Sequence, residues 1–491
     1  RQYEFSACAL QSERVLIGAG RDACLDFFAV FQADHPEPTS EHDLERVALE
    51  GRYPQRPCVP TEPGSTAVGN LFSEAPLFDS DDLSAEQLST YWNEPRRHVE
   101  TDGEGRLLSF FTTGNRHVVL KAKELLQERP TGALLRSGTG LVNAPGILST
   151  TAYMRGVFAS HLAVGNLSFN VGLSIRRDPL GVLLAGGIRV FVERDNAFEL
   201  LGVPSAFENS LNGCRWVYCN DADTIEVRTW AAIDSHAMHV AIRSLRSRRF
   251  RIAIGVVMGP PDAEPSLTDV VEVGTRDITL RPLEGSRFGD RNPGAFVRIV
   301  PGDLSALSQL GGDELLCPDN VSHGAPCLVM ETVEVDSFGL GFTGALTPTA
   351  PVPTTSELAA RSASAERELA RGQDAHASLM SNFDLVDGDP RIARVGTILP
   401  WFVQNAVIHM SAAHGLEQYL GAAWGTRDVC QGPTEMLLAF GRSADVREIL
   451  TVVFANQHTD GGWPQWFMYD NNGDIRAGDS HGDVVFWPLR A

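Results

Sequence analysis

The feature that most constrains the fold is a proline-rich segment at residues 347–355. The residue pattern of the chain changes there from one type of secondary structure to another. Three prolines fall within six residues there, which makes an extended, semi-rigid linker. Before it, short runs of β-branched and aromatic residues alternate with Gly, Pro, Asn and Asp, a pattern typical of strands and turns. After it, apolar residues recur at helical spacing. The chain is therefore predicted to be β first and helical afterwards.

Strand patterns are clearest in two segments of the β-rich part. Residues 224–230 alternate, so one face is predicted to carry Ile225, Val227 and Thr229 and the other to carry Glu226, Arg228 and Trp230. Residues 250–258 form a near-continuous apolar run, as expected for a central strand buried on both faces. Many short strands separated by turns predict a β-sandwich region over residues 1–347.

A linker is predicted at residues 348–380. Ser356 is expected to cap a helix with Glu357 in its first turn. This helix, which runs to about Leu379, has only a thin apolar stripe, so a spacer between domains is expected.

Core-like helices are predicted within residues 381–491. The first has one apolar face, formed by Leu399, Phe402, Val403, Ala406, Val407 and Met410. The second begins at Gly432-Pro433 and ends before Gly441. Ser443 is expected to cap the third, whose face comprises Val446, Ile449, Leu450, Val453 and Phe454. Short connections imply antiparallel helical hairpins, the unit of a bundle or a helical barrel.

Charge and cysteine content narrow the function classes. The chain has 41 Lys+Arg and 62 Asp+Glu, a net charge of −21, which argues against nucleic acid or an anionic membrane as partner. No apolar run is long enough to span a membrane. Eight cysteines in 491 residues are too few for a disulfide scaffold, so a reduced, cytoplasmic setting is expected. Cys214 and Cys219 are interpreted as buried thiols or, alternatively, metal ligands, although no Cys/His pair has zinc-like spacing.

The chemistry is concentrated in the last ninety residues. Residues 421–435 combine Trp424, Arg427, Asp428 and Gln431 with small residues. An aromatic face and fixed polar groups are what a pyranose requires, and Arg427 can bind vicinal hydroxyls or phosphate in bidentate fashion. The alternative is a salt bridge within the loop that shapes the start of a helix.

A second polar and aromatic set spans residues 460–469 and 478–488. Trp463, Gln465 and His481 lie among acidic residues there, which favours a sugar cleft over the alternative, aromatic capping of a core. Asp479 and Asp483 are four residues apart and could share a helical face. They could provide a general acid with a tuned pKa or simply an N-terminal charge cluster.

Other chemistries find little support in the sequence. Cys430 lies beside Gln431, but no His or Asn at a suitable spacing supports a nucleophile. His409 and His414 are five apart, which does not fit a helical metal pair. Neither a GxGxxG motif after a strand nor a Walker-type loop occurs.

Five blocks, in order, resemble the inverting glycoside phosphorylases typified by cellobiose and chitobiose phosphorylase: Trp401–Asn405, His414–Tyr419, Gly425–Pro433, Trp463–Phe467 and Gly478–Asp483. In the β-rich part, Gly202–Phe207 and Gly213–Trp216 are most similar to the branch that phosphorolyses β-1,2-linked glucans. Cellobiose-type members have a carboxylate after the motif's Gln, where this chain has Gly432.

The resemblance implies a β-sandwich, a helical linker and the first part of an (α/α)6 catalytic barrel. It implies a glycosyltransferase-type phosphorylase that converts a β-linked gluco-oligosaccharide, of β-1,2 linkage, and inorganic phosphate into α-glucose 1-phosphate and a shortened chain. A phosphate nucleophile replaces the second carboxylate of an inverting glycosidase, so no metal or organic cofactor is expected. The residues expected to bind substrate are Trp424, Thr426, Arg427, Asp428, Gln431, Trp463, Gln465, Asp479, His481 and Asp483, with Arg427 and Asp428 gripping the sugar at the cleavage subsite.

The general acid of the family lies downstream of the segment that matches residues 478–488. It is therefore expected beyond Ala491, with Asp483 as the fallback, and this chain alone is expected to be inactive. The rest of the same protein or another chain would complete the barrel, and a homodimer is a further expectation. The alternatives are an inverting β-glucan hydrolase on the same barrel and a non-catalytic carbohydrate-binding protein.

Overall fold

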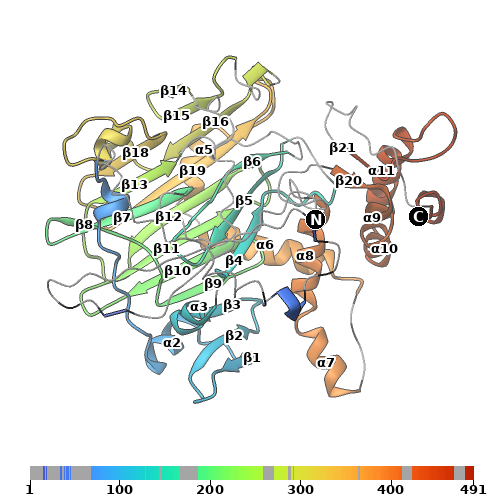
Figure 1. Cartoon of the computed structure of the whole chain (residues 1–491), viewed down its shortest axis with the longest axis horizontal. Helices are drawn as coiled ribbons and strands as arrows, with labels where there is room; N and C mark the ends of the chain where they lie inside the picture. The colour runs from blue at the N-terminus through green and yellow to red at the C-terminus, as the bar shows by residue number, and fades with distance from the viewer. Residues whose placement is uncertain are drawn as a thin grey trace. The chain divides into compact units, whose positions relative to one another are not determined.

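The computed structural model describes residues 68–491, except for 128, 143–145, 166–185, 258–269, 286–288, 291, 363–364, 384, 386–387, 412–422 and 469–481. Before residue 68 it describes only 15, 16, 18, 34, 35, 38, 40–43 and 45. The chain divides into two compact units, Tyr3–Val68 and Gly69–Ala491. In the first unit, Nε2 of His35 lies 2.8 Å from Oδ1 of Asp43. The architecture below is that of the second unit (Figure 1).

Most strands of the second unit belong to one eleven-stranded antiparallel sheet. Its order is β1 (Arg96–Thr101), β2 (Leu107–Thr112), β3 (His117–Leu120), β9 (Ala206–Asn209), β10 (Gly213–Cys219), β11 (Thr224–Ala231), β12 (Met238–Ser244), β19 (Ser337–Ala345), β16 (Phe296–Pro301), β15 (Ile278–Arg281) and β14 (Val270–Val273).

Two smaller sheets share a hydrophobic core with the large one. The five-stranded sheet has the order β17 (Leu307–Gly311), β18 (Cys327–Thr332), β13 (Ile252–Val257), β7 (Ile188–Arg194) and β8 (Ala197–Leu200). The three-stranded sheet comprises β4 (Gly132–Arg136), β5 (Leu148–Tyr153) and β6 (Ala163–Val164). Side chains of all three sheets, among them Trp216, Val190 and Leu148, meet in one buried cluster.

The central strand expected from residues 250–258 is confirmed as β13. It lies between β18 and β7 in the middle of the five-stranded sheet. Ile252 and Ile254 pack into the shared core, whereas Ala253 packs on the opposite face with Phe72 of α1 (Leu71–Glu74). Alternate side chains therefore enter two separate clusters, as the continuous apolar run indicates.

Strand β11 is buried along its whole length, including its charged residues. Arg215 on β10, Arg228 on β11 and Arg243 on β12 contact the carboxylate of Glu226 at 2.5, 2.8 and 2.6 Å. Burial raises the pKa of Glu226, but the three guanidinium groups outweigh it and hold that pKa at about 2. As predicted, Glu226 and Arg228 lie on the face opposite Ile225 and Val227, which pack into the shared core. Other elements cover the charged face as well, since β11 is buried throughout.

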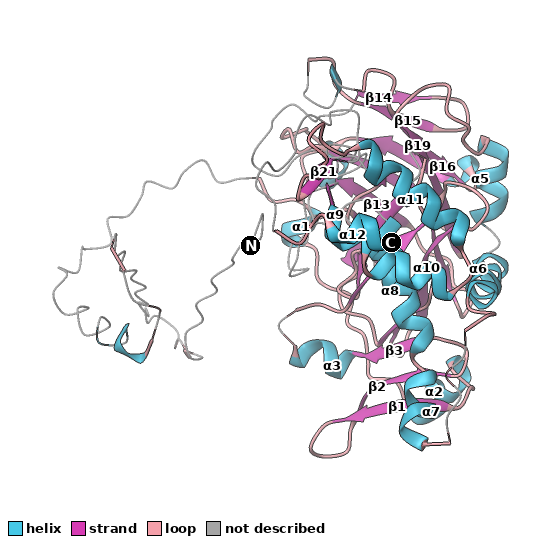
Figure 2. Cartoon of the chain, turned by 90° about the vertical axis from the view of Figure 1, so that its right-hand side faces the viewer, coloured by secondary structure: helices cyan, strands magenta, loops and turns pink. Residues whose placement is uncertain are grey.

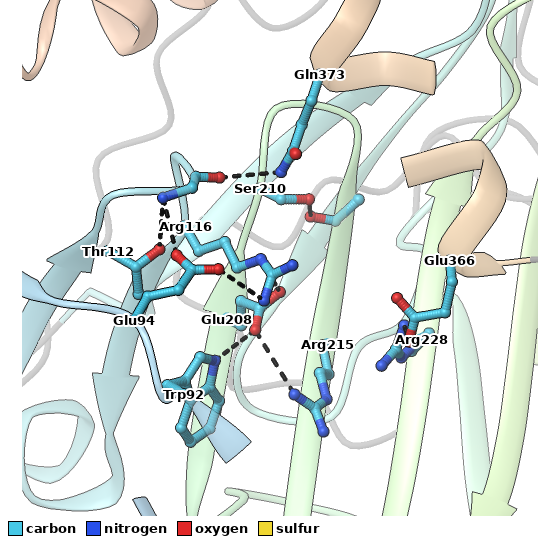
Figure 3. Close-up of polar contacts among 12 residues, drawn as sticks. Trp92, Glu94, Thr112, Arg116, Glu208, Ser210, Arg215, Arg228, Glu366 and Gln373 are labelled. Atoms are coloured by element: carbon cyan, nitrogen blue, oxygen red, sulfur yellow. Dashed lines mark hydrogen bonds and ion pairs between the residues drawn. The ribbon is translucent and has the colours of Figure 1, made fainter. Parts of the chain in front are cut away.

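A second carboxylate extends this network toward β9 (Figure 3). Glu208 accepts a hydrogen bond of 2.5 Å from Nε1 of Trp92, which follows α2 (Ala85–Tyr91). Glu208 also lies 3.8 Å from Nε of Arg116 and 3.7 Å from Nη1 of Arg215. Cross-strand pairing puts Arg215 directly between Glu208 and Arg228. The like charges of Arg215 and Arg228 are offset by Glu226, whose carboxylate contacts both guanidinium groups.

The described residues of the linker form two helices, where one spacer helix is predicted, and both pack on the large sheet. Leu358 of α5 (Thr355–Ser362) is fully buried beside β19, and α6 (Ala365–Leu379) lies over β11. Nη1 of Arg228 is 2.6 Å from Oε1 of Glu366 on α6. Because α6 docks largely through polar contacts, its thin apolar stripe suffices, and α5 and α6 are not detached spacers.

One cap was predicted two residues too late. Thr354, not Ser356, precedes α5: its hydroxyl accepts from the backbone N–H of Glu357 at 3.3 Å, and the Glu357 carboxylate accepts from the Thr354 N–H at 2.7 Å. This reciprocal capping box satisfies two donors at once, which a cap at Ser356 would leave to solvent.

A second core is formed by helices that follow the linker: α8 (Leu399–Ser411), α9 (Thr426–Cys430), α10 (Gly432–Ala439), α11 (Ser443–Ala455) and α12 (Phe486–Arg490). Figure 2 shows them close together. The helix α7 (Pro390–Gly396) precedes them and has no buried residue. Val403 and Val407 of α8 and Ile449 and Val453 of α11 meet in this core. The β region followed by a helical part is therefore as predicted.

Three details of these helices differ from the prediction. Phe402 and Phe454 were expected on buried faces but are 59% and 43% exposed, because no described residue covers the edge of the apolar stripe on which each lies. Ser443 is the first residue of α11 and Arg442 precedes it, without a side-chain cap.

A loop of the β region reaches into the helical core. Leu141 and Val142, which follow β4, are buried in the cluster that contains Val403 and Trp424. The loop is held by Arg136, whose guanidinium donates to the carbonyl groups of Gly138 and Gly140. Burial lowers the pKa of Arg136 to about 10. None of the helices in the described part of the chain is both long and apolar enough to cross a membrane.

The remaining short elements lie in the β region. They are α3 (Lys121–Leu126), the 3-10 helix η2 (Leu304–Ala306) and the 3-10 helix η3 (Asp313–Leu316).

Candidate functional site

Two of the segments predicted to bind sugar are joined by a short antiparallel pair. Strand β20 (Ala423–Gly425) pairs with β21 (Trp466–Met468), with Trp424 opposite Phe467. Thr426, which opens α9, donates its backbone N–H to the Gln465 carbonyl at 2.9 Å. Its hydroxyl donates to the Pro464 carbonyl at 2.6 Å. The fully buried Thr426 thus fixes the first segment to the second.

Both predicted tryptophans pack inside the protein. Trp424 is 1% and Trp463 is 5% exposed, and both belong to the helical core. Nε1 of Trp463 donates to the Val453 carbonyl at 3.1 Å, and its ring meets Phe454 edge-on with centroids 5.2 Å apart. Core capping, the alternative to a sugar cleft for residues 460–488, therefore describes Trp463, and Trp424 is a core residue of the same cluster.

The charged residues, by contrast, gather at the surface. Arg427 lies between two carboxylates: Nε is 3.9 Å from Oδ1 of Asp428, and Nη1 is 3.7 Å from Oδ2 of Asp483. The three side chains are 41%, 48% and 44% exposed. Neither distance is a hydrogen bond. Both parts of the motif, residues 425–433 and 478–483, therefore contribute to one charged cluster, here called the Arg427 cluster.

Trp487 is a member of this site that sequence reasoning missed. Its Nε1 donates to Oδ2 of Asp483 at 3.2 Å, from the first turn of α12. The available signal was the spacing of four residues, which brings two side chains together on a helical turn. Arg490 lies beside Trp487. Its guanidinium lies over the Trp487 ring and 2.6 Å from the Glu435 carboxylate.

A glycine makes room for the Asp428 carboxylate. A Cβ at Gly425 would lie 2.1 Å from Oδ2 and 3.0 Å from Cγ of Asp428. Gly425 precedes α9 with φ of −70°, so space rather than backbone conformation requires glycine here. The short aspartate side chain could move away only by leaving its place beside Arg427.

Gln431 and Gln465 make backbone contacts within the two segments, and Cys430 is buried in the helical core. Gln431 lies at the joint between α9 and α10, and its N–H donates to the Arg427 carbonyl at 3.0 Å. Gln465 contributes its carbonyl to Thr426, as described above. Cys430 is buried, and this burial raises the pKa of its thiol to about 12, so the thiolate of a nucleophile would be scarce near neutral pH.

Comparison with known proteins identifies the β region. Residues 94–344 match the profile of a family described as the glycoside phosphorylase supersandwich domain. This match covers half of the chain. The chain belongs to the glycoside phosphorylases. The match confirms the family resemblance. It runs from just before β1 almost to the end of β19 and includes Gly202–Phe207 and Gly213–Trp216.

A curated relative extends the similarity beyond the supersandwich domain. The chain is 31% identical over 496 aligned residues to a 1,2-beta-oligoglucan phosphorylase of Listeria innocua serovar 6a, with 100% of this chain and 43% of the relative covered. The glycoside phosphorylase chain thus spans less than half the length of this relative.

Two solved structures resemble parts of this chain. A bacterial glucoamylase complexed with acarbose has a TM-score of 0.43 at 8% identity, covering 70% of this chain and 53% of that one. A protein described as a kojibiose phosphorylase from the human microbiome has a TM-score of 0.39 at 10% identity, covering 74% and 50%.

Several predicted residues of this glycoside phosphorylase lie outside the described residues. Asp479 and His481 are among them, as is His414 of the second motif block. Cys214 and Cys219 are buried thiols, and burial raises the pKa of Cys214 far above its ordinary value. The group of metal-ligating side chains among the described residues includes neither of them.

Proposed function

We propose that this chain is part of an enzyme that reversibly phosphorolyses β-1,2-linked gluco-oligosaccharides, giving α-glucose 1-phosphate and a shortened chain. The observation that supports this proposal is the 31% identity to a 1,2-beta-oligoglucan phosphorylase, because it extends over the whole chain and includes the helical part. The supersandwich match over residues 94–344 supports the same class of reaction.

The Arg427 cluster is the proposed substrate-contacting part of the described chain. A guanidinium carries five N–H donors in a planar fork. Its contacts to Asp428 and Asp483 at 3.9 and 3.7 Å are too long for hydrogen bonds. Among the described residues these donors are thus left for sugar hydroxyls or phosphate oxygens, which a guanidinium can bind in bidentate fashion. Asp428 accepts hydrogen bonds from sugar hydroxyls.

Trp424, Thr426 and Trp463 have a supporting role in this proposal. Their burial fixes the backbone of residues 423–426 and 463–466, from which Arg427 and Gln465 extend. A rigid support of this kind keeps polar groups in place while a substrate binds and reduces the entropy lost on binding.

The reaction follows from single-displacement chemistry at the anomeric carbon. A phosphate oxygen attacks C1 of the sugar from the face opposite the glycosidic bond, so the C1–O(phosphate) bond forms as the C1–O(glycosidic) bond breaks. A carboxylic acid gives its proton to the departing oxygen, and the configuration at C1 inverts from β to α. Phosphate carries negative charge, and a cationic group such as Arg427 offsets it in the transition state.

The surroundings of Asp483 favour a binding role rather than that of the acid. Its Oδ2 lies 3.7 Å from Nη1 of Arg427 and accepts from the Trp487 N–H at 3.2 Å, so two protein groups already engage this oxygen. A general acid must instead present a proton to the departing glycosidic oxygen. We therefore place the general acid in the part of the enzyme that corresponds to the unmatched portion of the relative.

The helical part is proposed to be the beginning of an (α/α)6 barrel within residues 381–491, after a β-sandwich region over 1–347 and a linker over 348–380. An apolar groove between α10 and α11, lined by Leu438, Val446, Leu450 and Phe454 among others, supports this. Phe486 nearby on α12 is 67% exposed. Since the chain covers 43% of its relative, later helices of the same polypeptide are the proposed cover. Cytoplasmic location and a homodimer stay predictions.

The decisive experiment measures glucose 1-phosphate. The complete enzyme is incubated with inorganic phosphate and, separately, with β-1,2-, β-1,3-, β-1,4- and β-1,6-linked glucobioses and their longer oligomers. We expect glucose 1-phosphate from the β-1,2-linked substrates, in the α configuration by NMR. Equal release of glucose with and without phosphate would indicate a hydrolase instead. Sugar binding without turnover would indicate a carbohydrate-binding protein.

A further inference from the structure

A loop far from the Arg427 cluster in sequence brings three different metal-ligating side chains together. The loop joins η3 to β18 and contains Cys317, Asp319 and His323. Their ligand atoms, one thiol sulfur, one carboxylate oxygen and one imidazole nitrogen, all lie within 4.8 Å of one another. Around a tetrahedral Zn²⁺, with bonds of about 2.0–2.3 Å, neighbouring ligand atoms are about 3.6 Å apart. Small side-chain rotations would therefore bring the three atoms to a common ion.

We propose that Cys317, Asp319 and His323 form a zinc site, with a solvent molecule as the fourth ligand. A mixed set of thiolate, imidazole and carboxylate suits Zn²⁺ and excludes Mg²⁺ and Ca²⁺, which take oxygen ligands. On binding, the Cys317 thiol gives its proton to solvent and the sulfur bonds to the metal as thiolate. The hydrogen bond between Nε2 of His323 and Oδ2 of Asp319, now 2.9 Å, is replaced by two bonds to the ion.

The geometry of the loop would let a metal ion reach the three ligand atoms from solvent. Cys317 is only 6% exposed, so its sulfur lies at the base of the site. The side chains of His323 and Asp319 are 37% and 42% exposed, so an ion can enter from solvent. The other carboxylate oxygen of Asp319 accepts from the Val321 N–H at 3.1 Å, which leaves Oδ2 facing the imidazole.

Asp313 is the positioning residue of this loop. It accepts from the Ser322 hydroxyl at 2.5 Å and from the N–H groups of His323 and Ala325 at 2.9 Å each. These three hydrogen bonds hold residues 322–325, which include His323, against η3. The Asp313 carboxylate also adds negative charge beside the site, and this charge favours a divalent cation.

The test is binding of the metal alone to the reduced, chelator-treated 491-residue chain. Titration with ZnCl₂ against a chromophoric chelator should show one strongly bound equivalent, and CoCl₂ should produce thiolate-to-cobalt charge-transfer absorption. Cys317→Ser should abolish that absorption. Cys317→Ser and His323→Ala should each weaken zinc binding by more than about 100-fold, because loss of even an outer-shell partner typically costs 10- to 100-fold. Asp313→Asn should produce the smaller, outer-shell effect.

Two matched controls separate this site from other thiols and imidazoles. Cys430→Ser removes another buried thiol, 4% exposed, and His35→Ala removes a His that also contacts a carboxylate, at 2.8 Å. Both variants should bind zinc as the original chain does. Because His323 is exposed, His323→Ala is expected to fold even if Cys317→Ser does not. Absence of a stoichiometric zinc equivalent, or unchanged affinity in His323→Ala, would overturn the proposal.

Discussion

The hydroxyl of Thr426 donates a 2.6 Å hydrogen bond to the carbonyl of Pro464, and this contact joins two motif segments that are far apart in sequence. Thr426 begins the helix that carries Arg427 and Asp428, whereas Pro464 precedes the strand β21. The place of the charged cluster therefore depends on an uncharged, buried contact beneath it.

Replacing Thr426 with Val should destabilise this part of the protein. Valine keeps the shape but leaves the buried Pro464 carbonyl without its donor, which costs about 1–3 kcal/mol of the free energy of unfolding. Thr426→Ser is the control: it keeps the hydroxyl and loses one methyl group, worth about 0.8 kcal/mol. Urea unfolding of both variants measures the difference. A Val variant as stable as the Ser variant would contradict the assigned role.

Replacing Arg427 with Ala should reduce phosphorolysis by the complete enzyme without affecting its stability. A hydrogen bond to a charged group contributes about 1.5–3 kcal/mol, so kcat/KM is expected to fall by at least about 10- to 100-fold. Because the side chain is 41% exposed, the thermal midpoint should hardly change. Arg391→Ala, which removes an exposed arginine paired with Asp389 at the start of α7, is the control and should retain activity. Equal losses in both variants would argue against a specific role for Arg427.

Acid should destabilise the protein partly through Glu226. Its pKa is held at about 2 in the folded protein, against an ordinary value of 4.5. A depressed carboxyl pKa gives stability that is complete above the unfolded value and is lost as the pH falls through 4.5 toward 2. Glu226→Gln should lower the free energy of unfolding at pH 7 by on the order of 3 kcal/mol.

Equilibrium unfolding between pH 7 and pH 2 tests this expectation for Glu226. The variant should lose less additional stability over that range than the original protein. Glu272→Gln is the control because Glu272 forms an exposed pair with Arg281, and pairs of that kind contribute little. If Glu226→Gln had no larger effect than Glu272→Gln, the arginines around Glu226 would not stabilise the fold.

His117 should also make the free energy of unfolding depend on pH, but at higher pH values than Glu226 does. Burial lowers its pKa to about 4 from an ordinary 6.5, so the unfolded chain takes up a proton before the folded protein does. The free energy of unfolding therefore falls as the pH drops from 6.5 to 4. His117→Phe keeps the ring that stacks on Phe111, with centroids now 4.3 Å apart, but cannot take up a proton.

The slope of stability against pH between 6.5 and 4 is the measurement for His117. It should be smaller in His117→Phe than in the original protein. His42→Gln is the control, since the His42 side chain is 91% exposed and its loss should leave the slope unchanged. Identical slopes in all three proteins would contradict the assigned burial effect.

Much of the fold follows from local sequence patterns. The period of residues 224–230 and 250–258 identifies β11 and β13, and Gly432-Pro433 correctly begins α10. The neighbours of a strand are not local: Glu226 meets arginines from β10 and β12 because of cross-strand register. For this reason the dense charge network beneath α6 could not be read from the sequence.

The sequence predicts which residues of the site come together better than it predicts what each of them does. Arg427, Asp428 and Asp483 do come together, as the motif blocks indicate. Trp424 and Trp463 are in the same blocks, but an aromatic side chain serves equally well as a sugar platform or as a core residue. Only the tertiary structure shows that both are buried.

The burial of Leu141 and Val142 among the helices limits how this protein can be divided. A chimera that took the helical part from one relative and the sheets from another would need to carry this loop with the helices, although the loop lies more than two hundred residues before them. Cutting the chain at the proline-rich segment would leave a hole in one fragment and an exposed apolar loop on the other. Substitutions in this loop and in α8 are therefore expected to change together during evolution.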